Sequence, residues 1–163
     1  MKLYHGSNQK VEKPIADYST RFKMDFGRGF YTTTSEEQAR SFTNGVMIRN
    51  KNQGTKTVSI YRLDIAAFKD LNVKDFDGAT AEWFDYVEKN RRSEVIVELD
   101  YDIIMGPVAD DKINRTFTLY ETKVISREQA LKDLKTEIYK DQIVFKTQKS
   151  LEYLEYLGFV EVD

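Results

Sequence analysis

Cysteine is absent from this 163-residue sequence, and histidine occurs once, at His5. A structural zinc site normally takes four cysteine or histidine ligands, so an ordinary site of that kind is excluded and no metal cofactor is expected. The absence of cysteine also means that no disulfide can form, which fits a reducing compartment such as the cytoplasm.

Long apolar runs are missing as well. A membrane-spanning helix needs about 18 or more apolar residues in succession, and no segment of the chain approaches that length. The N-terminus lacks the apolar core and cleavage site of a signal peptide. We therefore expect a cytoplasmic protein, or an effector exported without a visible signal peptide, with no membrane as a partner.

The charges nearly cancel, with 25 Lys and Arg residues against 27 Asp and Glu residues. A formal net charge of −2 argues against a general nucleic-acid binder. Hydrophobic residues make up 40% of the chain, with ten Tyr and ten Phe among them, enough for an aromatic-rich core. The length fits a single domain over residues 1–163.

Several familiar catalytic motifs are absent: the sequence has no GxxxxGK[ST] phosphate loop, no HExxH and no GxSxG. Gly27-Arg28-Gly29 lacks the third glycine of a dinucleotide fingerprint. The two prolines, Pro14 and Pro107, lie in segments that we expect to be loops.

The distribution of β-branched, aromatic and capping residues predicts a mixed fold. Helices are expected to begin near Ser35, Thr80, Asp110 and Ser126, because capping-box or N-cap residues precede apolar residues at helical spacing. A further helix is expected over Thr147–Tyr156. Strands are expected at residues 2–5, 30–33, 56–63, 71–76, 101–105, 142–145 and 157–162. Because the order shows no regular strand–helix–strand rhythm, the expected class is α+β with antiparallel sheets.

Two motifs near the N-terminus indicate a ligand site. The first is Tyr4-His5-Gly6-Ser7, and the second is Phe26-Gly27-Arg28-Gly29-Phe30-Tyr31. Glycine lets a backbone come closer to a ligand than any residue with a Cβ. The sequence thus places an imidazole and a phenol on two expected strands, beside a backbone open to approach.

These two motifs, followed by a helix that contains Ala39 and Phe42, resemble the start of a poly(ADP-ribose) polymerase-type catalytic domain. The whole chain resembles an uncharacterised family of small bacterial proteins related to the ADP-ribosyltransferases. The segments Tyr101–Asp111 and Asp141–Phe145 resemble later motifs of that family.

The resemblance implies an ADP-ribosyltransferase-like fold of split antiparallel β-sheets flanked by helices, with NAD bound as a substrate in the cleft. It implies that His5 holds a ribose hydroxyl and that the Gly6 backbone pairs with the nicotinamide carboxamide. Tyr31 would stack on the nicotinamide ring, and Phe42 would close its other side. Aromatic faces with backbone donors and acceptors suit such an amide-bearing ring.

The remaining members of the implied NAD-binding set are Ser7 and Gly29. The implied reaction is transfer of one ADP-ribose unit from NAD to an unidentified acceptor, with release of nicotinamide. The resemblance implies His5 and Tyr31 as catalytic residues, Gln142 is our candidate for the third place, and Asp111 is our candidate for a substitute carboxylate. The acceptor is either a macromolecule or a small molecule, and a partner or antitoxin protein is a further expected contact.

Gln142 departs from the family pattern, because many of these enzymes carry a glutamate at this place. An amide hydrogen-bonds a hydroxyl but supplies no negative charge for the developing cation. Asp110 or Asp111 would supply a carboxylate if the loop turns either residue into the cleft. Otherwise these two aspartates serve as N-terminal charge for the following helix, and Gln142 is a polar residue of an edge strand.

Structural readings of the other candidates also stay open. His5 can be a satisfied structural histidine, Tyr31 part of the strand core, and Phe42 part of a buried helix face with Ala39 and Val46. Besides a transferase, the sequence allows a non-catalytic NAD- or ADP-ribose-binding module that acts through a partner, or an interaction protein without a nucleotide. The long connection Ile15–Asp25 is expected to close over a bound ligand.

Overall fold

The computed structural model describes residues 1–16, 24–92, 101–109, 111–135 and 140–163, without the side chain of Asp111. These residues form an α+β structure of two sheets and six helices. The strands are β1 (Lys2–Ser7), β2 (Phe30–Thr32), β3 (Thr57–Leu63), β4 (Val73–Asp75), β5 (Ile103–Pro107), β6 (Asp141–Phe145) and β7 (Leu154–Glu161). The helices are α1 (Glu36–Arg49), α2 (Ala67–Asp70), α3 (Ala81–Arg92), α4 (Asp111–Glu121), α5 (Arg127–Leu134) and α6 (Gln148–Leu151).

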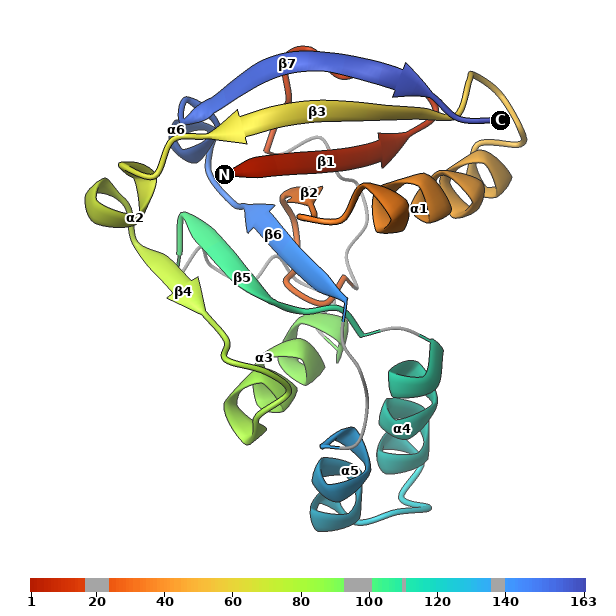
Figure 1. Cartoon of the computed structure of the whole chain (residues 1–163). Helices are drawn as coiled ribbons and strands as arrows, with labels where there is room; N and C mark the ends of the chain where they lie inside the picture. Colours follow the sequence, from red (N-terminus) through yellow and green to blue (C-terminus); the bar gives the residue numbers. More distant parts are fainter. Residues whose placement is uncertain (17–23, 93–100, 110, 136–139) are drawn as a thin grey trace.

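The two sheets have the strand orders β1-β3-β7 and β2-β6-β5-β4. Among the described strands the pairings are antiparallel, except that β4 runs parallel to β5. Among the described residues, one isolated bridge, between Tyr4 and Thr33, joins the sheets, and its two backbone hydrogen bonds measure 2.9 and 3.0 Å. Figure 1 shows the four-stranded sheet between the three-stranded sheet and the helices α3, α4 and α5.

Strand β6 separates two hydrophobic cores because successive side chains of a strand point to opposite faces. Val144 packs in a core with aromatic side chains of α3 and α4, among them Trp83, Phe84 and Phe117. Ile143 and Phe145, its neighbours on β6, pack instead in the core that lies between the two sheets. The same short strand therefore supports both halves of the molecule.

Helix α1 begins where the sequence predicts it, because the Ser35 side chain accepts a hydrogen bond from the Gln38 backbone N–H. The helix packs against β1 at Gly6, where a Cβ atom would come within 2.1 Å of the Ala39 carbonyl oxygen. The expected buried face was partly wrong: Ala39 and Thr43 are buried, whereas Phe42 is 48% exposed. Its ring lies under the Arg49 guanidinium, 5.4 Å from the ring centroid.

Asp141, the first residue of β6, connects the four-stranded sheet to the start of α1. The Asp141 carboxylate accepts hydrogen bonds from the hydroxyls of Thr33 at 2.6 Å and Thr34 at 2.7 Å. The Gln38 side chain donates to the Asp141 carbonyl at 2.8 Å. These contacts hold β6, and with it Gln142, in place against the connection between β2 and α1.

Two local predictions were wrong. The helix expected over Thr147–Tyr156 ends at Leu151, and the chain from Leu154 onward pairs with β3 as strand β7. Pro107 was expected in a loop but is the last residue of β5, opposite Asp141. A proline is tolerated at the end of a strand because few ladder hydrogen bonds remain for its missing N–H to break.

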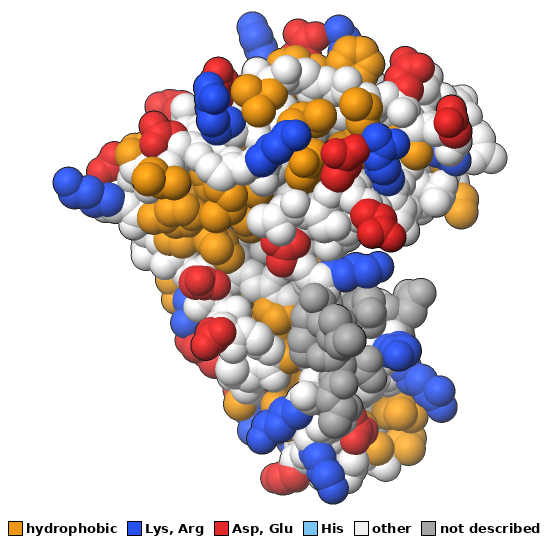
Figure 2. Space-filling view, viewed as in Figure 1, with side chains coloured by type: hydrophobic (Ala, Val, Ile, Leu, Met, Phe, Trp, Pro, Cys, Tyr) orange, Lys and Arg blue, Asp and Glu red, His pale blue; other side chains and the backbone are white. Residues whose placement is uncertain are grey.

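The face in Figure 2 has acidic and basic side chains interspersed, and hydrophobic side chains gather on the left over α2. Met1, Ile65 and Phe68 are among the exposed large hydrophobic residues. No helix in the described part of the chain is long and apolar enough to cross a membrane.

Candidate functional site

His5 lies on β1 with its ring against the ring of Phe30, at a centroid distance of 4.4 Å. Its Nδ1 atom is 2.7 Å from the Tyr31 carbonyl oxygen. Because a carbonyl only accepts, Nδ1 donates this bond and carries a proton. Burial lowers the pKa of His5 below its ordinary value of 6.5, so the neutral ring presents Nε2 as an acceptor at pH 7.

Tyr31 lies on β2, and its hydroxyl is bound to the turn that precedes the strand. The hydroxyl donates to the Gly27 carbonyl at 2.6 Å and accepts from the Phe26 N–H at 3.2 Å. The ring packs against the core that contains Val144. This phenol is therefore held by its own turn, and its structural reading from the sequence is partly right.

The two glycines of the second motif have separate reasons to be glycine. Gly27 has φ +72°, where a side chain is strained, and its N–H closes a turn onto the Met24 carbonyl at 3.0 Å. A Cβ on Gly29 would lie 2.6 Å from the Val144 side chain and 2.8 Å from the Phe145 carbonyl oxygen. The backbone that approaches Gly29 is thus strand β6 of the protein itself.

Gly6 and Ser7 follow His5 on β1, and Phe42 lies on α1, the helix that packs against that strand. Helix α1 fills the side of Gly6 on which a Cβ would project, and Gly6 lies opposite Val58 in the pairing of β1 with β3. Ser7 is half-buried opposite Thr57, with its hydroxyl 3.4 Å from the Asn8 side chain. Phe42 is the most exposed of the predicted aromatic contacts, and the Arg49 guanidinium lies over its ring.

Gln142 lies on β6 and is only 5% exposed. Its amide nitrogen donates to the Pro107 carbonyl at 2.9 Å and to the Asp25 carboxylate at 3.2 Å. Asp25 also accepts from the Ala109 backbone N–H at 2.8 Å. Burial is the main cause that raises the pKa of Asp25, while the Ala109 N–H, the Arg91 charge and Gln142 act in the opposite direction.

Asp25 is a candidate site residue to which sequence reasoning gave no role. It directly precedes Phe26-Gly27, so a carboxylate next to that motif was the available signal. Of the two aspartates proposed instead, Asp110 lies outside the described residues. Asp111 is the first residue of α4, but its side chain is outside the described part. Most of the expected closing loop, residues 17–23, is outside it too.

The turn at residues 25–27 brings three candidates together: Asp25 contacts Gln142, and Phe26 and Gly27 hold the Tyr31 hydroxyl. Tyr31 lies opposite Val144, and Gln142 is two residues from Val144, so both side chains project from the same face of the sheet. His5 instead contacts Phe30, whose side chain projects from the other face. The candidates therefore lie on both sides of β2.

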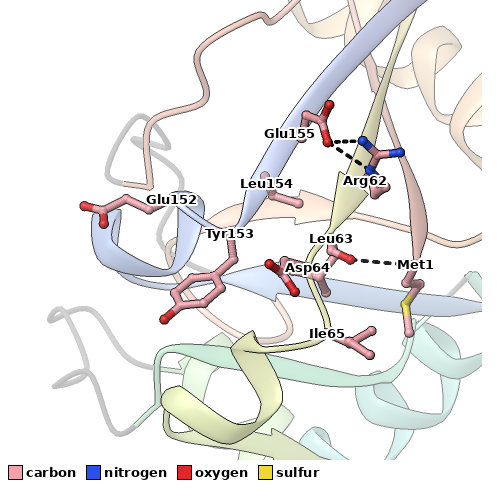
Figure 3. Close-up of a pocket in the computed structure, with 9 residues that line it drawn as sticks. All are labelled: Met1, Arg62, Leu63, Asp64, Ile65, Glu152, Tyr153, Leu154 and Glu155. Atoms are coloured by element: carbon pink, nitrogen blue, oxygen red, sulfur yellow. Dashed lines mark hydrogen bonds and ion pairs between the residues drawn. The ribbon is translucent and has the colours of Figure 1, made fainter.

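Of two cavities in the structure, one lies away from the predicted site residues and the other reaches one of them. The larger, of about 670 Å³, opens between the ends of β3 and β7 and contains none of the predicted site residues (Figure 3). In it the Arg62 guanidinium donates to the Glu155 carboxylate. A smaller cavity of about 260 Å³ reaches Gln142 and is lined also by Thr34, Asp141 and Pro107.

The described residues contain no group of three or more His, Cys, Asp or Glu side chains that could hold a metal ion. Among curated proteins, none matches the chain. One family does match, over residues 1–156, and its description is "Protein of unknown function (DUF3990)". Because the match covers nearly the whole sequence, this chain belongs to the DUF3990 family.

Proposed function

We propose that this protein binds NAD and transfers ADP-ribose from it to an acceptor, with release of nicotinamide. The observation that carries the proposal is the fixed tautomer of His5. Its Nδ1 donates to the Tyr31 carbonyl, and its lowered pKa keeps the ring neutral. Nε2 is then an acceptor that a ribose hydroxyl can use, and no described residue is hydrogen-bonded to it.

The arrangement of the sheets also supports an ADP-ribosyltransferase-like fold. The two sheets are joined at one bridge, between Tyr4 and Thr33. This bridge lies between His5 on one sheet and Tyr31 on the other. A split antiparallel sheet with the histidine and tyrosine motifs at the junction is the arrangement that the resemblance implies.

In the proposed reaction the bond between C1′ of the ribose and the nicotinamide nitrogen breaks, and its electron pair leaves with nicotinamide. A hydroxyl or amine of the acceptor then bonds to C1′ and loses its proton to solvent. Cation-like charge on the ribose is stabilised by a nearby carboxylate. We assign this role to Asp25, the carboxylate that contacts Gln142.

The test is incubation with NAD, with nicotinamide release followed by chromatography and NAD affinity measured by calorimetry. We expect His5→Ala to weaken NAD binding by about 1–3 kcal/mol, because it removes one partner of a buried polar pair. Gln9→Ala, at an exposed position just beyond β1, is the matched control and should bind like the wild type. Equal NAD affinity in all three proteins, or no NAD binding at all, would reject the proposal.

A second candidate is a non-catalytic NAD- or ADP-ribose-binding module that acts through a partner protein. It is favoured by the state of Gln142, whose amide has no charge and is already engaged by Pro107 and Asp25. The same experiments separate the candidates. A thermal shift with NAD but no nicotinamide release supports the module, whereas release supports the transferase.

A further inference from the structure

Arg91, near the end of α3, carries a buried polar atom without a hydrogen-bond acceptor among the described residues. The atom is Nη1 of the guanidinium. The residue as a whole is half-buried, so its side chain is not sealed inside the core. Most buried polar groups in folded proteins are hydrogen-bonded, so this N–H is a donor for an acceptor that does not belong to the described residues.

The guanidinium of Arg91 is held in place by an aromatic ring. It lies over Phe117, 5.1 Å from the ring centroid, and Phe117 is 1% exposed in the core between α3 and α4. Stacking on a ring occupies the flat face of a guanidinium and leaves its N–H edge for acceptors in the plane. The charge is thus oriented before any ligand binds.

The nearby acids do not occupy this N–H edge. Glu88, one turn earlier on α3, pairs with Arg92 at 2.9 Å. Asp25 interacts electrostatically with Arg91, but its hydrogen bonds come from the Ala109 N–H and the Gln142 amide. Within the described part of the chain, no hydrogen bond or ion pair joins Asp25 to Arg91.

Further positive charge lies beside the same turn. Lys146 is 9% exposed, and its ammonium donates to the Phe26 carbonyl. A Cβ on Gly27 would lie 3.2 Å from this ammonium. It would lie 2.8 Å from the side-chain oxygen of Asn90. Asn90 and Arg91 are neighbours on α3, so the two cations are on adjoining sides of the turn at residues 25–27.

We propose that Arg91 binds a phosphoryl oxyanion. This inference rests on the proposed function in one respect, because it assigns the oxyanion to the pyrophosphate of NAD. Guanidinium groups bind phosphate through N–H···O bonds, and Nη1 of Arg91 is a donor for one of them. The position also agrees with the proposed site, since Arg91 is electrostatically coupled to Asp25, and Asp25 contacts Gln142.

The first experiment uses inorganic pyrophosphate as the probe, titrated into the full chain by calorimetry at fixed ionic strength. Arg91→Gln should weaken pyrophosphate binding at least tenfold, and Arg91→Lys, which keeps the charge but not the fork, should weaken it by a smaller factor. Arg92→Gln, at the adjacent exposed position, is the matched control and should bind like the wild type. If circular dichroism shows that Arg91→Gln is unfolded, the pyrophosphate affinity of Arg91→Lys decides the test.

The proposal would be overturned if Arg91→Gln and Arg92→Gln lost the same affinity for pyrophosphate. It would also be overturned if the wild type did not bind pyrophosphate. Acetate that competes as well as inorganic phosphate would also overturn it, in favour of a carboxylate ligand. A second set of titrations uses NAD, ADP-ribose and nicotinamide. Arg91→Gln should weaken the binding of NAD and of ADP-ribose at least tenfold and leave the affinity for nicotinamide unchanged.

The two titrations separate the two proposals. If pyrophosphate binds through Arg91 but neither NAD nor ADP-ribose binds, the proposed function fails and the phosphoryl site stands. If NAD binds with an affinity that Arg91→Gln does not change, the proposed function stands and the assignment of Arg91 is wrong.

Discussion

The carboxyl group of Asp25 is 3.2 Å from the Gln142 amide and 2.8 Å from the Ala109 nitrogen. Its pKa lies above the ordinary value of 3.8, so the folded state holds the proton more tightly than the unfolded state. The corresponding stability is present below pH 3.8 and is lost as the pH rises through the folded pKa. Above the folded pKa the buried, ionised side chain therefore lowers the free energy of unfolding.

We expect Asp25→Asn to raise the free energy of unfolding at pH 7, because the asparagine oxygen can accept the same two hydrogen bonds without a buried charge. The gain should shrink as the pH falls toward 3.8. Denaturant unfolding at several pH values measures it. Asp75→Asn, an exposed aspartate at the end of β4, is the control. A gain that is independent of pH would contradict the burial of this charge.

Exchange of the carboxyl and amide groups tests whether Asp25 supplies the catalytic charge. Gln142→Glu alone places two carboxylates in contact, which raises the pKa of the pair and should lower both stability and NAD cleavage at pH 7. Asp25→Asn alone should abolish cleavage. The double variant restores one carboxyl and one amide, and we expect it to recover stability and part of the turnover, measured as nicotinamide release. Faster cleavage by Gln142→Glu alone would show that Asp25 plays no such part.

The titration of His5 gives a direct measurement, because the chain has no other histidine. The pKa of His5 lies below 6.5, and burial of the ring is the main cause of this shift. A lowered pKa stabilises the fold above pH 6.5, and that stability is lost as the pH falls through the folded pKa. The single imidazole resonance in NMR spectra should therefore titrate below pH 6.5. A midpoint above that value would contradict the neutral tautomer on which the proposed NAD contact depends.

At the scale of elements, the contact between α1 and β1 depends on the missing side chain of Gly6. A Cβ there would lie 2.1 Å from the Ala39 carbonyl oxygen, which belongs to the helix backbone. We expect Gly6→Ala to lower the free energy of unfolding by about 1–3 kcal/mol, the usual cost of overpacking a core.

Gly45 on the same helix is the matched control for Gly6. A Cβ at this position meets only the end of the flexible Arg49 side chain, at 3.0 Å. Gly45→Ala should raise stability by about 0.5–1 kcal/mol, because alanine loses less backbone entropy in a helix. Chemical denaturation measures both variants, and equal effects of the two would exclude a specific contact at Gly6.

At the scale of the whole molecule, β6 joins the two hydrophobic cores. Val144 belongs to one core, and Ile143 and Phe145 belong to the other. Because β6 contributes side chains to both cores, unfolding of β6 disrupts both of them. We therefore expect one cooperative unfolding transition. The single tryptophan, Trp83, reports the core below the four-stranded sheet. Its fluorescence and the far-UV circular dichroism should change at the same denaturant concentration, whereas separate midpoints would mean that the sheets unfold independently.

Much of the fold follows from local residues, because capping and periodicity act over a few positions. Ser35 and Ser126 cap α1 and α5 as their sequence patterns predict, each by accepting the backbone N–H three residues later. Trp83, Phe84 and Val87 form the buried side of α3, as their spacing indicates. The α+β class and the strands that carry His5, Tyr31 and Gln142 were predictable for the same reason.

Tertiary structure decided the remainder. The segment after Leu151 became β7 because seven residues of β3 supply its backbone partners, and that pairing outweighs a helical sequence pattern. Phe42 is exposed because the packing of α1 on Gly6 selects Ala39 and Thr43 as the buried face. Asp25 meets Gln142 across 117 positions of sequence. Contacts of this range depend on how sheets and helices assemble, so the carboxylate of the candidate site became visible only in the folded chain.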